Sequence, residues 1–508
     1  MTAALLISQQ PANCQESGGD QNGFVSDISF SPIVKETNEV NDDKRLRWFI
    51  LFLLFVSSVA AQNSTELYRG RRKALLKKIG RNNVAIFKAA PVARRNGDVD
   101  YEYRQDSDFY YLTGFEEPGA ILVLSPRGIY VRDESKFVKE ILFLRPRDPH
   151  MEIWQGYRLG VERAKEKLGV QAALPIDRFE DYLTAILGRV DTLYIKTSRV
   201  KLDEPLSKEM EFIKRARERL YDFTVASPGK LLTPMREIKS EAELALLQKA
   251  IDITCEAHRE AMKAARPGMF EYQLEAVIEY VFKKNGSERP GFPSIIGSGP
   301  NSCILHYNTN RRRMQKGDMV VMDIGAEYGM YTADVTRTIP VNGKFSKAQR
   351  EIYNIVLEAQ NAGIAAAKVG APFGAPAQAA VRKVVEGLIR LGILKGDVQT
   401  NIQNGRYRAF FMHGTSHHIG LDVHDVSTYR PLKPNMIITV EPGIYISEAT
   451  GREHGVPKKY WNIGVRIEDD VLITEEGPKI LSAGAPRTIE AIEKNDVQIF
   501  NHLLTPTA

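Results

Sequence analysis

The sequence contains little cysteine, with three residues among 508. Cys14 lies in a polar leader, which leaves Cys255 and Cys303 for the folded part of the chain. Two cysteines do not make a disulfide framework, and neither stands in a CxxC or similar ligand pattern. This scarcity argues against a disulfide-stapled domain and against a thiolate metal site, and it predicts two buried thiols.

A comfortable membrane span is also missing, because the apolar run Trp48–Ala61 is too short for one. The run follows the basic segment Lys44–Arg47 and ends with small residues before Gln62. These features match a secretory signal, although 47 residues precede a run that normally starts near the N-terminus. We predict a cleaved export signal. A membrane anchor, another targeting segment, or a start site set too far upstream are the alternatives.

Residues 1–43 are polar and show no apolar period, so we predict that they are disordered and that residues 1–62 form a leader. The location of the protein then depends on segment 44–62. We expect an exported or membrane-associated protein if this segment works as a signal, and a cytoplasmic protein otherwise. Membrane contact is expected only if the leader persists as an uncleaved anchor.

The formal charge of +6 is spread along the chain, and no nucleic-acid-binding module accompanies its short basic clusters. We therefore expect no nucleic-acid partner. Hydrophobic residues make up 43% and charged residues 26%, which is typical of a globular protein, and 508 residues suffice for two or three domains.

Alternating strand and helix patterns predict an α/β domain over residues 66–230. The expected elements are a helix over 67–79, strands over 83–88, 129–132, 140–144 and 192–195, a strand–turn–strand unit over 109–125, and helices over 160–167 and 178–187. Thr233-Pro234 marks a boundary, after which Ser240 is a plausible N-cap for a helix running to about Ala265. A second domain follows over residues 238–482, and residues 483–508 are expected to form a C-terminal helix and tail.

The segment MVVMDIGAEYGMYTADVTRTIP (319–340) predicts a hairpin that carries two aspartates. If the hairpin folds symmetrically about Tyr328-Gly329, Asp323 and Asp334 lie directly opposite each other, with Cβ atoms about 5 Å apart. Two carboxylates in an apolar hairpin repel each other and are costly to bury, whereas a bound cation removes that cost. The alternative is a pair of surface aspartates on an edge hairpin.

The segment FFMHGTSHHIGLDVHD (410–425) holds four of the nine histidines of the chain. They are His413, His417, His418 and His424. The glycines between them argue against a regular helix and for loops that bring imidazoles to a site. A single histidine would more often be a satisfied core residue, but four clustered histidines favour a site.

Two further segments, IITVEPGIY (437–445) and GVRIEDDVLIT (464–474), place a glutamate on or at the end of an apolar strand. Glu441 is followed by Pro442-Gly443, so a turn residue is the alternative there. Arg466 and Glu468 share one face of their strand, and a surface pair is the alternative. Four carboxylates and at least one imidazole suit Mn²⁺, Co²⁺ or similar ions, and a pair of such ions can activate water for hydrolysis.

With these segments in view, the chain resembles the pita-bread metallopeptidases, and among them aminopeptidase P (Xaa-Pro aminopeptidase) more than prolidase. The motifs are YRQDSDFYYLTGFEEPGA (103–120), GSGPNSCILHY (297–307), the Asp323/Asp334 hairpin, HGTSHHIGLDVHD (413–425), TVEPGIY (439–445) and GVRIEDD (464–470). The resemblance implies an α/β (α+β) fold. Its parts are an N-terminal creatinase/aminopeptidase P-like domain and a C-terminal pita-bread catalytic domain.

The resemblance also implies two divalent metal ions per subunit, with Mn²⁺ favoured. Asp323 is expected to bind one metal, Asp334 and Glu468 to bridge both, and His417 and Glu441 to complete the second. A hydroxide that bridges the metals would attack the scissile carbonyl, with Glu441 guiding the proton toward the leaving nitrogen.

Other positions match pocket residues of the family. His424 is expected to hold the substrate carbonyl and the oxyanion, and His306 and His413 to position the substrate. Arg466 is expected to support the bridging glutamate, and Tyr445 matches a pocket aromatic.

The implied reaction releases the N-terminal residue from peptides whose second residue is proline. Prolidase, which cleaves Xaa-Pro dipeptides, is the alternative with the same metals and fold. A creatinase-like enzyme without metals and a non-catalytic binding protein are further alternatives, and retention of all five ligands argues against both. The family commonly forms dimers or tetramers, so we expect a homo-oligomer.

Overall fold

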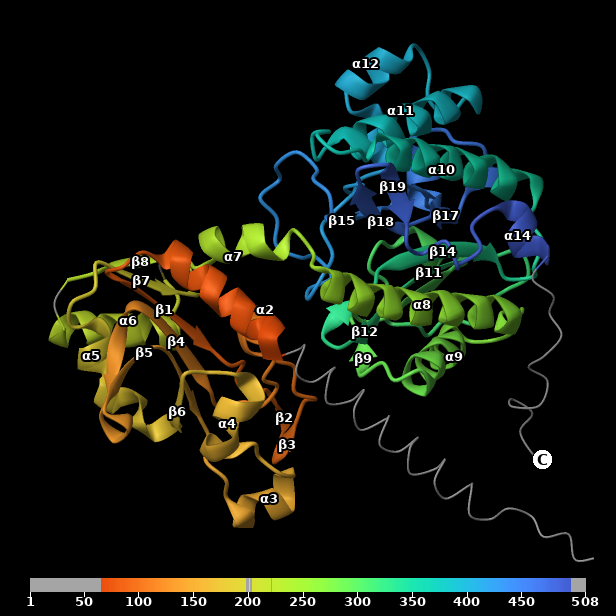
Figure 1. Cartoon of the computed structure of the whole chain (residues 1–508). Helices are drawn as coiled ribbons and strands as arrows, with labels where there is room; N and C mark the ends of the chain where they lie inside the picture. Colours follow the sequence, from red (N-terminus) through yellow and green to blue (C-terminus); the bar gives the residue numbers. More distant parts are fainter. Residues whose placement is uncertain (1–64, 198–200, 202, 221, 495–508) are drawn as a thin grey trace, which may run out of the picture. The chain divides into compact units, whose positions relative to one another are not determined.

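The computed structural model describes residues 65–494, except 198–200, 202 and 221 (Figure 1). The predicted disordered leader, the export signal over 44–62 and the tail over 495–508 lie outside the described residues. Contacts group residues 62–508 into one compact unit. Within the described residues, no helix combines the length and apolar character needed to cross a membrane.

A six-stranded mixed sheet forms the N-terminal part, as the alternating pattern predicts. Its strand order is β6 (Ala172–Pro175), β5 (Lys136–Leu144), β4 (Ile121–Val131), β1 (Asn83–Lys88), β7 (Thr192–Ile195) and β8 (Thr224–Ala226). β1 is antiparallel to β4 and parallel to β7. Apolar clusters pack on both faces of this sheet, against the helix over residues 65–79 on one face and α6 (Lys208–Arg219) on the other. Because the strands are buried on both faces, their sequences are apolar runs, and helical segments separate these runs along the chain.

One predicted strand in this part is wrong. Residues Ser107–Thr113 form helix α2 instead of the first strand of the unit over 109–125, although their aromatic side chains favour strands. Asp106 caps the helix by accepting hydrogen bonds from the amides of Asp108 and Phe109, and Gly114 ends it with a positive φ of 63°. The cap and the burial of the aromatic side chains outweigh strand propensity.

The predicted boundary is not a simple linker, because it contains helix α7 (Gly229–Arg236) with Pro234 inside it. Ser240 then caps α8 (Glu241–Ala264) as predicted and forms a capping box with Glu243. Helix α9 (Glu271–Lys284) follows.

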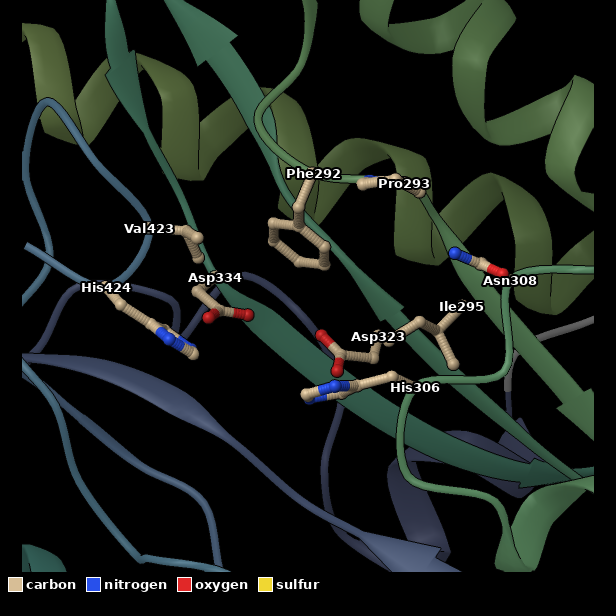
Figure 2. Close-up of a pocket in the computed structure, with 9 residues that line it drawn as sticks. All are labelled: Phe292, Pro293, Ile295, His306, Asn308, Asp323, Asp334, Val423 and His424. Atoms are coloured by element: carbon tan, nitrogen blue, oxygen red, sulfur yellow. The ribbon is translucent and has the colours of Figure 1, made fainter. Parts of the chain in front are cut away.

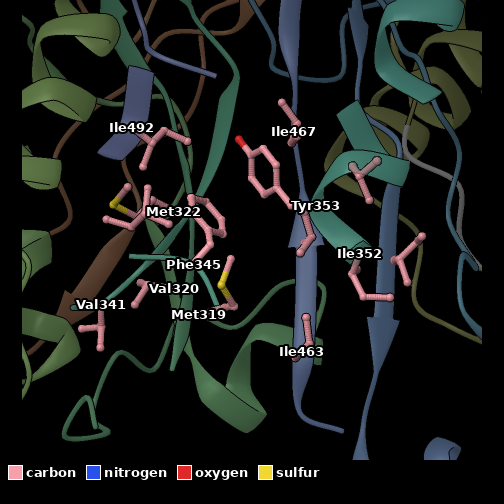
Figure 3. Packing of buried hydrophobic residues seen from close by; sticks show 14 of the residues in the cluster. Met319, Val320, Met322, Val341, Phe345, Ile352, Tyr353, Ile463, Ile467 and Ile492 are labelled. Atoms are coloured by element: carbon pink, nitrogen blue, oxygen red, sulfur yellow. The ribbon is translucent and has the colours of Figure 1, made fainter. Parts of the chain in front are cut away.

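The C-terminal part has small antiparallel sheets between helices (Figure 1). The sheets are β10 (Ile295–Ser298), β11 (Met319–Ile324) and β14 (Val335–Pro340); β9 (Arg289–Pro290), β12 (Ala326–Tyr328) and β13 (Tyr331–Thr332); β15 (Ile437–Val440), β18 (Asp469–Thr474) and β19 (Gly477–Ile480); and β16 (Gly443–Ile446) with β17 (Ile463–Arg466). In Figure 1, β11, β14, β15, β17 and β18 lie between α8 on one side and α10 (Lys347–Ala366) and α11 (Ala375–Arg390) on the other, while β9 and β12 lie beside α8 and α9. Figure 3 shows the resulting core, which includes Met322, Phe345 and Tyr353, with the ring centroids of Phe345 and Tyr353 4.9 Å apart. This apolar support fixes the strands that carry the aspartates.

The hairpin register differs from the prediction by two residues. Asp323 pairs with Thr336, not with Asp334. The reason is the turn, in which Gly329 and Met330 both take positive φ, at 57° and 69°, as a two-residue hairpin turn requires. Because the shift is even, Asp323 and Asp334 still project from the same face.

Candidate metal centre

Five side chains from separate segments converge, and two of them, Asp323 and Asp334, line a pocket. Asp323 belongs to β11, Asp334 precedes β14, His417 lies in the loop before β15, Glu441 follows β15 and Glu468 stands between β17 and β18. We refer to these five residues as the candidate metal centre. One ligand atom each from Asp334, His417 and Glu468 lies within 4.8 Å of the others. His417 Nε2 also lies 3.6 Å from Glu441 Oε1.

The pocket above this centre has a volume of about 240 Å³. Its lining combines the two aspartates with His306, His424, Asn308 and the apolar side chains of Phe292, Pro293, Ile295 and Val423. Figure 2 shows the carboxylates of Asp323 and Asp334 directed into the same space, which His306 and His424 border. The apolar lining residues and Asn308 were not predicted, because no local pattern distinguishes them from core or loop residues.

The carboxylates of the centre are buried without enough positive charge. Asp334 is 5% exposed and Glu468 is 2% exposed. Burial, and then the nearby Asp323, raise the pKa of Asp334 well above its usual value, while burial and Asp334 do the same for Glu468. Burial also raises the pKa of Glu441 to about 7, despite the nearby charges of His417 and Arg466. Each shift means that ionising the carboxyl costs free energy in the folded protein.

These residues fit divalent metal ions. The Oδ1 atoms of Asp323 and Asp334 are buried and lack a hydrogen-bond partner among the described residues. A buried, unsatisfied carboxylate oxygen is unfavourable, and coordination of a cation satisfies it. The donor set of four carboxylates and one imidazole is of the kind that hard to borderline divalent ions prefer.

Arg466 contacts the centre directly at Asp323 and reaches Glu468 through Thr336. Its Nη2 donates to Asp323 Oδ2 at 2.6 Å, and its Nε donates to Thr336 Oγ1 at 3.2 Å. The Thr336 hydroxyl then donates to Glu468 Oε2 at 2.8 Å. Arg466 therefore contacts the predicted glutamate only through Thr336. Thr336 was missed, although its spacing of two from Asp334 places both residues on one face of the chain.

Arg466 also contacts Tyr445, and Tyr445 in turn contacts His413. His413 Nε2 lies 2.8 Å from the Tyr445 hydroxyl, which accepts a hydrogen bond from Arg466 Nη1 at 2.8 Å. Burial, and then Arg466, lower the pKa of His413 to about 4, so its imidazole is neutral at pH 7.

The remaining predicted histidines divide into two groups. His424 and His306 line the pocket, whereas His418 stacks on Phe373 with ring centroids 5.2 Å apart and is not among the lining residues. His417 Nδ1 donates a hydrogen bond to the His418 carbonyl at 3.0 Å, which orients its Nε2 toward the carboxylates. Asp470, another residue not predicted, accepts a hydrogen bond from the Asp334 amide at 3.1 Å.

Comparison with known proteins covers most of the chain. The family model "Aminopeptidase P, N-terminal domain" matches residues 68–194, and "Metallopeptidase family M24" matches residues 245–475. The chain is 42% identical over 438 residues to the Xaa-Pro aminopeptidase of Escherichia coli (strain K12), covering 85% of this chain and 97% of that one. The predicted combination of an aminopeptidase P-type N-terminal domain and a C-terminal metallopeptidase domain is confirmed. The domain bounds remain predictions.

Solved structures agree with this result. The structure of Pseudomonas aeruginosa aminopeptidase PepP has a TM-score of 0.78 and 39% identity, covering 85% of this chain and 97% of that one. Escherichia coli aminopeptidase P with the inhibitor Pro-Leu has a TM-score of 0.77 and 41% identity, with 85% and 98% covered.

Proposed function

The chain belongs to the Xaa-Pro aminopeptidases of metallopeptidase family M24, and we propose that it removes the N-terminal residue from peptides with proline at the second position. It is a metal-dependent aminopeptidase. The observation that carries the proposal is the convergence of Asp334, His417 and Glu468 within 4.8 Å, beside carboxylate oxygens that have no partner of their own.

Two divalent ions, with Mn²⁺ favoured, would be held by Asp323, Asp334, His417, Glu441 and Glu468. When bound, such ions activate a water molecule and polarise the scissile carbonyl. The surrounding residues then have to bind the peptide, stabilise the oxyanion and deliver a proton to the leaving group.

Glu441 is the residue best placed to move that proton. The nitrogen of an Xaa-Pro bond carries no hydrogen, so the departing proline must gain a proton to leave as an amine. Glu441 belongs to the candidate metal centre and lies 3.6 Å from both His413 Nδ1 and His417 Nε2. It accepts a proton from the attacking water and donates it to the proline nitrogen.

His424 and His306 line the pocket, where their imidazoles can donate hydrogen bonds to the substrate. Burial, and then His417, lower the pKa of His424, so its imidazole is uncharged at neutral pH. A neutral imidazole donates an N–H bond to the carbonyl and to the developing oxyanion without repelling nearby metal ions. Arg466 holds Asp323 and Tyr445 in place from behind.

Exposed apolar side chains support the expected homo-oligomer. On and just after α3 (Pro149–Gln155), Ile153 is 80% exposed, Trp154 83% and Tyr157 89%. Contiguous apolar exposure of this kind is typical of a subunit contact. Sedimentation of the wild type and of Trp154→Glu tests this, because a dimer or tetramer should shift toward monomer in the variant.

The leader concerns location and not chemistry. We propose that segment 44–62 directs export and that the chain is cut between Ala61 and Gln62. N-terminal sequencing of protein recovered outside the expressing cell tests this, since an intact leader or a retained protein would contradict it.

The activity test compares an Xaa-Pro-Pro tripeptide with an Xaa-Pro dipeptide, each incubated with the purified protein and Mn²⁺ and followed by mass spectrometry. Release of the first residue from the tripeptide, with the dipeptide nearly untouched, supports the proposal. Cleavage of the dipeptide alone would instead identify a prolidase. A chelator should abolish the activity.

A further inference from the structure

His424 lines the active-site pocket, but no hydrogen bond to its imidazole fixes it there among the described residues. The residue is exposed, and within the described part of the chain no group forms a hydrogen bond with its imidazole. Its nearest aromatic neighbour is His417, with ring centroids 4.3 Å apart. The position of the imidazole must therefore be set by the backbone of the loop over residues 421–425.

Acidic residues on both sides of His424 tie this loop down. Asp425 pairs with Arg236 and, at 3.0 Å, with Lys239 Nζ. Asp422 accepts from Arg236 Nη2 at 2.8 Å. Arg236 is 3% exposed and Lys239 is 1% exposed, so both cations are committed to the interior. Two carboxylates that bracket one histidine thus share one buried guanidinium.

The N-terminal part reaches the same loop through the YRQDSDF motif (103–109), which the proposed chemistry does not use. Ser107 Oγ donates to Asp422 Oδ1 at 2.6 Å, and Asp108 Oδ1 accepts from Arg236 Nη1 at 2.8 Å. Arg104 donates to the Leu421 carbonyl and, through Nε, to Glu327 Oε2 at 2.6 Å. Three residues of one short motif therefore contact the His424 loop directly or through Arg236.

We infer that Arg104, Ser107, Asp108, Arg236 and Lys239, which we call the loop anchor, are positioning residues that hold Asp422 and Asp425 and thereby fix the His424 imidazole over the pocket. This inference rests on the proposed role of His424 in binding the substrate carbonyl. None of the anchor residues is among those that line the pocket.

The loop anchor is not the one contact that joins the two parts of the chain among the described residues. Arg71 and Glu243 form another buried pair between them, 3.2 Å apart, and Tyr331 contacts both. Among the described residues, no hydrogen bond or ion pair joins Arg71 or Glu243 to residues 421–425, whereas the anchor converges on that loop. A displacement of about 1 Å in a catalytic group can reduce the rate by as much as a hundredfold, so a rigid loop has a direct effect on turnover.

The test substitutes Asp422→Asn, which removes the charge that Arg236 and Ser107 hold. The Asp422 side chain is 41% exposed, so the variant should fold. With an Xaa-Pro-Pro tripeptide and Mn²⁺, kcat should fall by about tenfold to a hundredfold while KM changes less than about twofold, because the lost interaction acts in the transition state. The matched control is Glu243→Gln, which weakens the other pair and should lower the melting temperature without changing kcat.

A double-mutant cycle separates positioning from general stability. If Asp422 acts through His424, the Asp422→Asn effect should nearly vanish in a His424→Gln background. An equal effect in both backgrounds, or an unchanged kcat in Asp422→Asn alone, would overturn the inference.

A crystal structure of the Asp422→Asn variant gives a readout that does not need activity. The inference predicts a displaced or poorly ordered His424 ring, and a ring in its original place would overturn it. Absence of Xaa-Pro cleavage by the wild type would overturn the proposed function, and the crystallographic result would still decide whether the anchor fixes the loop.

Discussion

The loop anchor and the candidate metal centre are both groups of buried charges, but their charges are matched differently. In the anchor and the loop that it holds, each of the three carboxylates of Asp108, Asp422 and Asp425 pairs with Arg236, and Asp425 also pairs with Lys239. Among the described residues, Arg466 is the one arginine or lysine that contacts any of the four carboxylates of the metal centre, and it does so at Asp323. The anchor thus contains the cations that pair with its carboxylates, whereas the metal centre needs bound cations.

The pKa shifts follow the same division. Burial alone would lower the pKa of Arg236, but Asp425, Asp108 and Asp422 raise it above its usual value. For Asp334, burial and the neighbouring Asp323 both act in the same direction and oppose ionisation. Buried charge that is paired internally holds a structure together, whereas buried carboxylates without internal partners mark a place for a cation.

The largest effect is expected when the unmatched region loses a ligand. Asp334→Ala should reduce kcat/KM by at least about a thousandfold, because the metal ions contribute several kcal/mol of transition-state stabilisation. Metal content measured by mass spectrometry should fall with activity. Asp318→Ala is the control, since Asp318 pairs with Arg312 outside the centre. A metal-replete but inactive Asp334→Ala protein would contradict a role for Asp334 as a ligand.

The next effect concerns stability in the matched region. Arg236→Met leaves three carboxylates without their shared guanidinium and should lower the free energy of unfolding by about 3–5 kcal/mol, as when one partner of a buried ion pair is removed. Urea denaturation measures this. Arg178→Met, at an exposed pair with Asp181, should cost no more than about 1 kcal/mol. Equal costs at the two sites would show that the anchor is not a buried charge network.

A pH titration of the metal-free protein should show that stability falls when Glu441 in the metal centre ionises. The pKa of Glu441 is raised from 4.5 to about 7, so between these values the folded state keeps a proton that the unfolded state has lost. Stability from this group is complete below pH 4.5 and falls as the pH rises toward 7, by up to about 1.4 kcal/mol per pH unit. Urea denaturation in EDTA, at pH 5 and pH 7, should show a smaller difference for Glu441→Gln than for the wild type. Identical differences would contradict the raised pKa.

The two regions also differ in how far the sequence predicts them. All five metal-centre residues stand beside apolar strands or in a histidine-rich segment, so local pattern and family resemblance pointed to them. The register of Asp323 and Asp334 was wrong by two, because it depends on which residues take positive φ in the turn, and Met330 is not an expected one. The face was still right, because side chains alternate with a period of two.

The loop anchor left no comparable local signal. Ser107 and Asp422 are 315 positions apart, and each is an ordinary polar residue in its own segment. The anchor's first residues were also assigned to the wrong context, because the aromatic side chains after Asp106 suggested a strand where a capped helix forms. Contacts between distant segments depend on how the two parts pack, which neither periodicity nor spacing encodes.

The smallest expected effect tests whether the anchor tolerates the loss of a neutral member. Ser107→Ala removes the 2.6 Å hydrogen bond to Asp422 but leaves Arg236 in place, so we expect a stability loss of about 1 kcal/mol and a few-fold decrease in kcat. Ser207→Ala provides the control, because Ser207 caps α6 and its loss should cost a similar amount of stability with no change in kcat. Thermal denaturation and steady-state kinetics on both variants measure the two quantities. If both variants lose stability and neither loses turnover, Ser107 contributes only to packing, and the positioning of His424 rests on the charged members of the anchor.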